Sequence, residues 1–150
     1  MEIVTGDKNK ILRTRSETIT EITPEILRLI KEMKETLLNA ENGVGLAAPQ
    51  IGKNIRLFIA AEDIAKEGHT VFINPEITQI SKKLIPEEEG CLSLPGEWHE
   101  LSRADKVTIK AMDEKGEKFK IRVKGILARL MLHEVDHLNG TLFVDHLKHK

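Results

Sequence analysis

The residues best suited to chemistry are His133, Glu134 and His137, which form an H-E-x-x-H pattern. Two histidines at positions i and i+4 of a helix lie on one face, so both imidazoles can reach the same metal ion. Glu134 projects about a quarter-turn away, where it can reach a water molecule at the metal instead of the metal itself. The alternative is a chance spacing on a solvated helix. We disfavour it because the surrounding helix is apolar, and two unpaired histidines and an acid would be costly there.

A catalytic metal site needs a third protein ligand besides the two histidines. Asp145 and His146 are the local donors that follow His137, and Cys91 is the only thiol in the chain. A thiolate with two imidazoles leaves the fourth position of a tetrahedral site open for water, and the spacing favours Cys91 over Asp145 or His146. The alternative for Cys91 is a small buried hydrophobe. A single cysteine excludes a disulfide within the chain.

Residues 43–52 form a third segment, rich in small residues that let a ligand or another backbone approach closely. The segment follows a predicted helix and lacks the spacing of a phosphate-binding loop, so it does not predict a dinucleotide site. Taken alone, it is best explained as the end of a helix followed by a turn. Gln50 is more informative, because a carboxamide beside a metal could donate a hydrogen bond to a developing oxyanion.

Together, these segments resemble the peptide deformylase family. Residues 43–50 (GVGLAAPQ) resemble its first motif, residues 89–93 (EGCLS) its second and residues 133–137 (HEVDH) its third. The three motifs are intact, occur in the family's order and are separated by similar intervals. The similarity extends over most of the chain, from about residue 25 to about residue 145.

The resemblance implies hydrolysis of the N-formyl group from the initiator methionine of newly synthesised polypeptides, with release of formate. It assigns a divalent metal to Cys91, His133 and His137, and it makes Glu134 the group that moves the proton of water to the leaving amine. One thiolate and two imidazoles suit Fe(II), Zn(II), Ni(II) or Co(II). The resemblance favours Fe(II), with Zn(II) a frequent occupant.

The resemblance also assigns the remaining catalytic and binding contacts. The side chain of Gln50 and the backbone N–H of Leu92 would donate to the oxyanion, and the substrate backbone would lie against Val44 and Gly45 as an added strand. The expected partners are N-formylmethionyl peptides or nascent chains. Many family members carry a further C-terminal helix that these residues do not supply, so ribosome docking through such a helix is not carried over.

Several neighbours of the motifs have two interpretations each. Glu89 and Arg103 form either a pair that braces the segment around Cys91 or two solvated charges. Asp136 either orients a ligand histidine or faces solvent. Trp98 and His99 are expected in a loop, where they either edge the substrate pocket or are simply exposed.

The composition predicts one catalytic domain, residues 1–150, with a core of its own. Lys and Arg number 23, Asp and Glu 24, and the formal net charge is -1. This balance supports neither nucleic-acid binding nor a membrane surface. Aromatic residues make up only 3%, which argues against stacking platforms for single strands. No targeting or membrane-spanning segment is evident, so a cytoplasmic location is expected.

Two helices are expected to position the motifs. The first begins at Thr23-Pro24-Glu25, a typical helix start, and continues to about Ala40, ending near Asn42-Gly43. The second runs from Gly125 to Leu138, is apolar nearly all round and is therefore predicted to be buried. Residues 1–22 are expected to be irregular or partly extended.

Short strands are predicted around the second helix. Residues 55–61 and 70–73 are apolar runs, the latter ended by Asn74-Pro75, and residues 76–84 alternate weakly enough to suggest a strand pair. Residues 107–111 and 119–123 alternate on either side of a turn at 113–116, which predicts a β-hairpin. The predicted fold class is α+β, with short, mostly antiparallel strands around a central metal-binding helix.

Two alternative functions remain open. H-E-x-x-H alone also fits a zinc metallopeptidase, which predicts cleavage of unformylated peptides and tolerance of Cys91→Ala. A non-catalytic binding protein of the same fold would be expected to have a broken motif at Glu134 or Gln50, and both residues are present.

Overall fold

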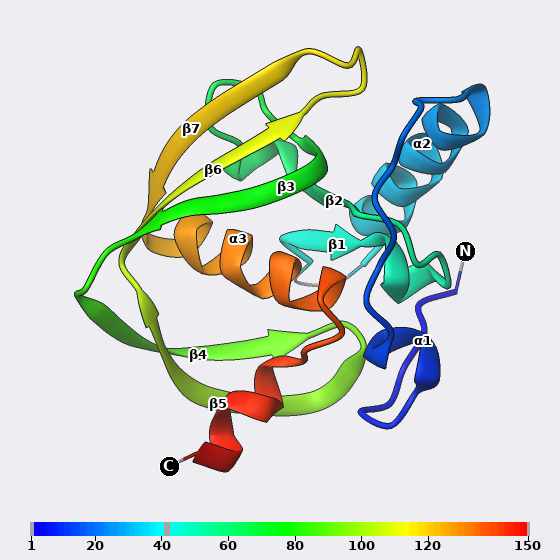
Figure 1. Cartoon of the computed structure of the whole chain (residues 1–150). Helices are drawn as coiled ribbons and strands as arrows, with labels where there is room; N and C mark the ends of the chain where they lie inside the picture. Colours follow the sequence, from blue (N-terminus) through cyan, green and yellow to red (C-terminus); the bar gives the residue numbers. More distant parts are fainter. Residues whose placement is uncertain (1, 41–42, 150) are drawn as a thin grey trace.

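The fold consists of two antiparallel sheets on either side of one central helix (Figure 1). The computed structural model describes residues 2–40 and 43–149. The larger sheet has the strand order β1-β2-β3-β6-β7, and β4 and β5 form the second sheet. This arrangement confirms the predicted fold class. The strands are β1 (Gly45–Ala47), β2 (Leu57–Ala60), β3 (Val71–Ile80), β4 (Leu84–Cys91), β5 (Leu94–Ala104), β6 (Lys106–Met112) and β7 (Lys118–Lys124).

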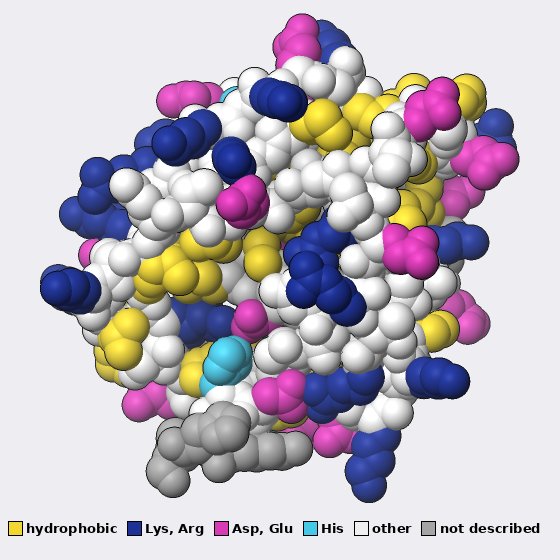
Figure 2. Space-filling model, in the orientation of Figure 1, with side chains coloured by type: hydrophobic (Ala, Val, Ile, Leu, Met, Phe, Trp, Pro, Cys, Tyr) yellow, Lys and Arg dark blue, Asp and Glu magenta, His cyan; other side chains and the backbone are white. Residues whose placement is uncertain are grey.

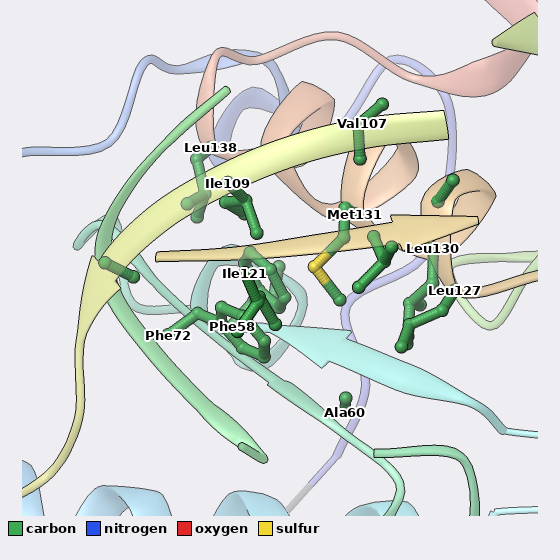
Figure 3. Close-up of a cluster of buried hydrophobic side chains, with 14 of the residues drawn as sticks. Phe58, Ala60, Phe72, Val107, Ile109, Ile121, Leu127, Leu130, Met131 and Leu138 are labelled. Atoms are coloured by element: carbon green, nitrogen blue, oxygen red, sulfur yellow. The ribbon is translucent and has the colours of Figure 1, made fainter. Parts of the chain in front are cut away.

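The central helix α3 (Gly125–Leu138) has the predicted bounds and lies between the two sheets. Figure 3 shows its apolar side chains, Leu127, Leu130, Met131 and Leu138, in one buried cluster with side chains of the larger sheet. From the sheet come Phe58, Phe72, Ile109 and Ile121, all nearly inaccessible to solvent. Burial of this cluster against β2, β3, β6 and β7 fixes the helix that carries His133 and His137.

The first long helix, α2 (Pro24–Leu38), begins as predicted. The Thr23 hydroxyl accepts a hydrogen bond from the Ile26 N–H, and Pro24 occupies the first turn, where no N–H is needed. The helix ends at Leu38, slightly before the predicted Ala40. Asn42, near which the end was expected, lies outside the described residues.

Strand β3 shows that the prediction of a strand end at Asn74-Pro75 is wrong. Asn74 has φ 50°, and the register with β6 shifts between Ile73 and Glu76, so the dipeptide forms a bulge inside a longer strand. The Asn74 side chain holds the bulge by exchanging two hydrogen bonds of 2.8 Å with the backbone of Ile19. The predicted strand pair within residues 76–84 is also wrong, because residues 76–80 continue β3 and pair with β6, whereas Leu84 begins β4.

The predicted hairpin is present as β6–β7, but a second hairpin, β4–β5, was not predicted. Its two strands pair along nearly their whole length and meet at a turn of two residues, Leu92 and Ser93. Trp98 and His99 therefore lie on a strand, and the expectation of a loop there is wrong. The second motif is held in a sheet, which restricts the position of Cys91 more than a loop would.

The N-terminal segment is mostly irregular, as expected, but contains one short helix, α1 (Lys10–Arg13), capped by the Asn9 side chain. Short 3₁₀ helices follow β1, β2 and α3: η1 (Ala48–Ile51), η2 (Glu62–Ile64) and η3 (Phe143–His149). Within the described residues, no helix combines the length and apolar character needed to span a membrane.

Candidate active site

The structure brings together Cys91 from the end of β4 and His133 and His137 from α3. Their ligand atoms all lie within 4.8 Å of one another, and the Cys91 Sγ lies 3.2 Å from His137 Nε2. The other candidate donors lie elsewhere, since Asp145 pairs with Arg13 and His146 with Asp136. Among the described residues, the geometry therefore favours Cys91 as the third ligand.

His133 is oriented by Glu89, the first residue of the second motif. The His133 Nδ1 lies 2.7 Å from the Glu89 carboxylate, which accepts hydrogen bonds, so Nδ1 carries the proton. The other ring nitrogen, Nε2, is then available as a metal ligand beside Cys91 and His137. Arg103 from β5 binds the same carboxylate through two nitrogens, at 2.9 and 2.7 Å. Burial opposes ionisation of Glu89, but hydrogen bonds from His133 and Arg103 hold its pKa well below the usual range. Of the two interpretations of Glu89 and Arg103, the structure shows the pair.

Arg129 completes this network, and the sequence analysis missed it. One of its nitrogens donates to Glu89 and to the Leu101 carbonyl, both at 2.9 Å, and the other donates to the Ile85 carbonyl at 2.6 Å. Arg129 thus ties α3 to both strands of the β4–β5 hairpin. The available signal was its place four residues before His133, on the same face of the helix.

Asp136 is held by two side chains outside the group of potential ligands. Its carboxylate accepts hydrogen bonds of 2.9 Å from Arg103 and from His146. Among the described residues, neither of these hydrogen bonds involves His133 or His137, so the interpretation of Asp136 as the direct acceptor of a ligand histidine is not supported. Asp136 contributes indirectly, because it binds the Arg103 guanidinium, which in turn binds Glu89.

Glu134 lies beside the Cys-His-His group and is only 2% exposed. Its Oε1 has no hydrogen-bond partner among the described residues. A Cβ placed on Gly45 would lie 2.6 Å from Glu134 Oε2. The carboxylate can therefore pack against β1 only because residue 45 has no side chain. Burial, the largest effect, raises the pKa of Glu134 to about 7. A buried carboxylate with a free oxygen is poised to exchange a proton.

Gln50 lies in η1 with its carboxamide buried against the second motif. Its Oε1 accepts from the Ala47 N–H at 2.9 Å, and its Nε2 lies 3.6 Å from Cys91 Sγ and 3.2 Å from Ser93 Oγ. The carboxamide nitrogen therefore lies between Cys91 and Ser93, beside the group of potential ligands. Leu92 lies in the turn that directly follows Cys91.

A cavity of about 570 Å³ opens onto these residues. Val44 and Gly45 form part of its wall, and Trp98 lines it while remaining 56% exposed. The Trp98 ring covers Gly90 on the neighbouring strand, where an added Cβ would lie 2.7 Å from the ring. Trp98 thus edges the pocket, whereas His99 is not part of its lining. The cavity is lined by Ile3, Ala40, Gly43, Val44, Gly45, Gln50, Glu88, Glu89, Gly90, Cys91, Leu92, Leu94, Pro95, Gly96, Trp98, Ile126, Arg129, Leu130, His133 and Glu134.

The donor set fits a divalent metal ion. A thiol sulfur and two imidazole nitrogens are the ligands of open, three-residue metal sites. The surroundings of His133 favour positive charge, because although burial lowers its pKa, hydrogen bonds to Cys91 and Glu89 raise it, and a bound cation would supply that charge in place of the proton. Burial lowers the pKa of His137 well below its ordinary value, which keeps this imidazole neutral and able to coordinate.

Comparison with known proteins agrees with this geometry. The family described as Polypeptide deformylase matches residues 1–150. A peptide deformylase of Clostridium botulinum is 49% identical over 91% of this chain and 90% of its own length. One from Halothermothrix orenii is 47% identical over 90% of this chain and 86% of its own.

A solved structure shows the same fold. The crystal structure of peptide deformylase from Thermotoga maritima matches with a TM-score of 0.88 and 35% identity, covering 97% of this chain and 95% of that one. The match includes both sheets and the central helix, because almost nothing of either chain is left out. This chain therefore belongs to the peptide deformylase family, a family of metal-dependent hydrolases.

Proposed function

We propose that the Cys91, His133 and His137 site removes the formyl group from the N-terminal formylmethionine of newly synthesised polypeptides and releases formate. The observation that carries this proposal is the Cys-His-His group beside a buried Glu134 oxygen that has no hydrogen-bond partner within residues 2–40 and 43–149, at the wall of an open cavity. Nascent chains are the expected partners, and the cytoplasm, where they are made, is the expected location.

Cys91, His133 and His137 would hold one divalent metal ion, with Fe(II) favoured and Zn(II), Ni(II) or Co(II) as alternatives. Such an ion, when bound, polarises a carbonyl oxygen and lowers the pKa of water toward neutrality. The fit rests on the mutual distances of the three ligand atoms and on Glu89, which fixes the His133 tautomer that leaves Nε2 free.

Glu134 acts as the proton carrier in this proposal. It accepts a proton from the attacking water, whose oxygen forms the new bond to the formyl carbon. It then gives the proton to the amine nitrogen as the carbon–nitrogen bond breaks, which leaves a free methionine amine; the second proton of the water stays on formic acid, which ionises to formate on release. Its burial excludes competing water, and the absence of a side chain at Gly45 gives its carboxylate room.

Gln50 and Leu92 would stabilise the oxyanion that forms on the formyl oxygen. Gln50 Nε2 already lies near Cys91 Sγ, and a small rotation away from Ser93 would free one amide hydrogen for the substrate. The Leu92 N–H follows Cys91 directly in the turn. Loss of one such donor typically raises a barrier by about 2.7–4 kcal/mol.

The substrate backbone would lie beside Val44 and Gly45. β1 is an edge strand of the larger sheet, so an extended peptide can add to its unpaired side. Leu94, Trp98 and Leu130 give the cavity apolar walls, which suit the flexible side chain of methionine.

The direct test is formate release from formyl-Met-Ala-Ser by anaerobically purified protein whose metal content is measured on the same sample. The proposal predicts metal-dependent release of formate and no cleavage of unformylated Met-Ala-Ser. A zinc metallopeptidase would instead cleave internal bonds of unformylated peptides and keep that activity in Cys91→Ala. Metal-loaded protein that releases no formate would contradict the proposal.

A further inference from the structure

The strands β6 and β7 carry six exposed cations and no acid, whereas the turn between them carries Asp113, Glu114, Lys115 and Glu117. We call the surface formed by the six cations the basic face; it consists of Lys106 and Lys110 on β6, and Lys118, Lys120, Arg122 and Lys124 on β7. All six are exposed, whereas the alternate residues of both strands point into the core. Figure 2 shows dark blue Lys and Arg side chains along the upper left of the molecule, where Figure 1 places β7.

The register of the hairpin places like charges directly opposite each other. Lys106 pairs with Lys124, and Lys110 pairs with Lys120. Like charges at opposed positions destabilise an antiparallel sheet. One acid relieves this repulsion: Glu76 on β3 lies 3.3 Å from the Lys110 ammonium. The two opposed lysine pairs therefore do not stabilise the hairpin.

Protection of an edge strand explains only part of the arrangement. β7 is the last strand of the larger sheet, and lysines on an edge strand discourage pairing with another chain. Lys106 and Lys110 lie on β6, however, which is hydrogen-bonded on both sides. Their positive charge needs another explanation, and a partner with negative charge supplies one.

Charges of opposite sign are concentrated on the two hairpins, and the near-zero net charge of the chain does not reveal this. β4 and β5 carry five acids, Glu87, Glu88, Glu89, Glu97 and Glu100, and a single cation, Arg103. β6 and β7 carry six cations and no acid. The balance of 23 against 24 charges over the whole chain therefore says little about either surface.

We propose that the basic face binds the phosphate backbone of structured RNA. Successive cations on β7 stand about 6.8 Å apart, and β6 adds a second row about 4.8 Å away, so the face presents a regular array to a phosphate chain. Cations of this kind position a protein on a nucleic acid without reading its sequence.

The side chains between the cations favour structured RNA over other anionic partners. None of the large exposed hydrophobics among the described residues lies on β6 or β7, and a membrane-binding surface would need such side chains. Phe119, the single aromatic of the hairpin, is half-buried and stacks on His69 with ring centroids 3.8 Å apart. No ring is therefore offered to the bases of a single strand.

The basic face and the active site can be occupied together. The cavity over Cys91 is lined by residues of β1, β4, β5 and α3 and by neighbouring loops, but by none of β6 or β7. α3 and the core cluster separate the two surfaces. RNA bound at the hairpin would leave the cavity open to a peptide.

The test compares two variants of equal net charge for binding to a fluorescein-labelled RNA duplex, followed by fluorescence anisotropy. The first replaces Lys118, Lys120, Arg122 and Lys124 with Gln. The control replaces Arg28, Lys31, Lys34 and Lys53 with Gln, which removes the same kinds of charge from α2 and the segment after η1. Both variants should release formate from a short formylated peptide at the wild-type rate.

Wild-type protein and the control should bind the duplex with similar affinity, and the β7 variant should lose at least about tenfold at low salt. If about four phosphates are contacted, wild-type affinity should fall on the order of 10²-fold between about 50 and 200 mM salt. Should the β7 variant unfold, Lys106→Gln with Lys110→Gln gives the same comparison from β6.

Four outcomes would overturn the proposal. Wild-type protein could fail to bind the RNA duplex at low salt, or the two four-site variants could lose the same RNA affinity. The RNA affinity could also be independent of salt concentration, or the protein could bind vesicles of phosphatidylcholine and phosphatidylglycerol more tightly than RNA. The last outcome would assign the face to a membrane.

Discussion

The two long hairpins of this molecule, β4–β5 and β6–β7, flank the same helix but are held by different interactions. β6–β7 points Val107, Ile109, Ile121 and Val123 into the main core. β4–β5 also buries Leu94, Leu101 and Ala104, but in addition it buries a charged pair, Glu89 with Arg103. The difference separates two tasks. The β6–β7 hairpin, here called the apolar hairpin for its buried side, stabilises the fold; the β4–β5 hairpin, called the charged hairpin for its buried ion pair, orients the potential ligands Cys91 and His133.

Glu89→Ala should have the largest combined effect, because it removes the bidentate partner of the buried Arg103, which then keeps only Asp136 among the described residues, and it removes the acceptor of His133 Nδ1. We expect a loss of about 3–5 kcal/mol in the free energy of unfolding and about 10–100-fold weaker metal binding. Urea denaturation and competitive metal titration measure the two quantities.

The matched control for Glu89→Ala is Glu76→Ala, which removes an acid that is 63% exposed and paired with Lys110. The control should change stability by no more than about 1 kcal/mol and leave metal affinity unchanged. Equal effects of the two substitutions would mean that the charged hairpin has no special role.

Ile109→Ala tests the apolar hairpin. Ile109 is fully buried against the central helix, so the cavity left behind should cost about 2–5 kcal/mol of stability. Metal affinity of the folded protein should stay at the wild-type value. A large drop in affinity would show that the two tasks are not separate.

Arg129→Met should have an intermediate effect. It removes the hydrogen bonds to Glu89, Leu101 and Ile85, and unfolding should become easier by about 1–3 kcal/mol. Metal affinity should fall by less than in Glu89→Ala, because Arg103 still binds Glu89. Arg122→Met on the exposed face of β7 serves as the control, with a change within about 0.5 kcal/mol.

Lys120→Glu should give the smallest effect and the opposite sign. It replaces a like-charge pair with an attractive pair opposite Lys110, so thermal unfolding should show a gain of about 0.2–1 kcal/mol. A loss of stability would indicate that repulsion across the basic face is already relieved in wild-type protein.

The same contrast explains how much of the fold could be predicted. The β6–β7 hairpin was evident because apolar and charged residues alternate along it, with a turn between. β4–β5 has no such alternation: Glu87, Glu88 and Glu89 look alike in sequence, yet only the last is buried. Its place is determined by partners far along the chain, which a local pattern does not contain.

The candidate site was more predictable than the elements that hold it. The types and spacing of His133, Glu134 and His137 already indicate metal chemistry, and the ordered motifs add Cys91 and Gln50. Arg129 belongs to no motif; its place one helical turn before His133 was a weak signal, and its role follows from the two carbonyls and the carboxylate that the fold brings to it. The bulge at Asn74 was missed for a similar reason, because contact with Ile19 stabilises it.

The most direct test of the account is Glu134→Gln, assayed on one preparation for both bound metal and formate release. We predict that the variant binds one metal ion with wild-type affinity, because Cys91, His133 and His137 are untouched. Formate release should fall by about 10²–10⁴-fold, since the amide cannot accept the proton. A variant that keeps the wild-type rate, or that loses its metal along with its activity, would contradict the separation of metal binding from proton transfer on which the account depends.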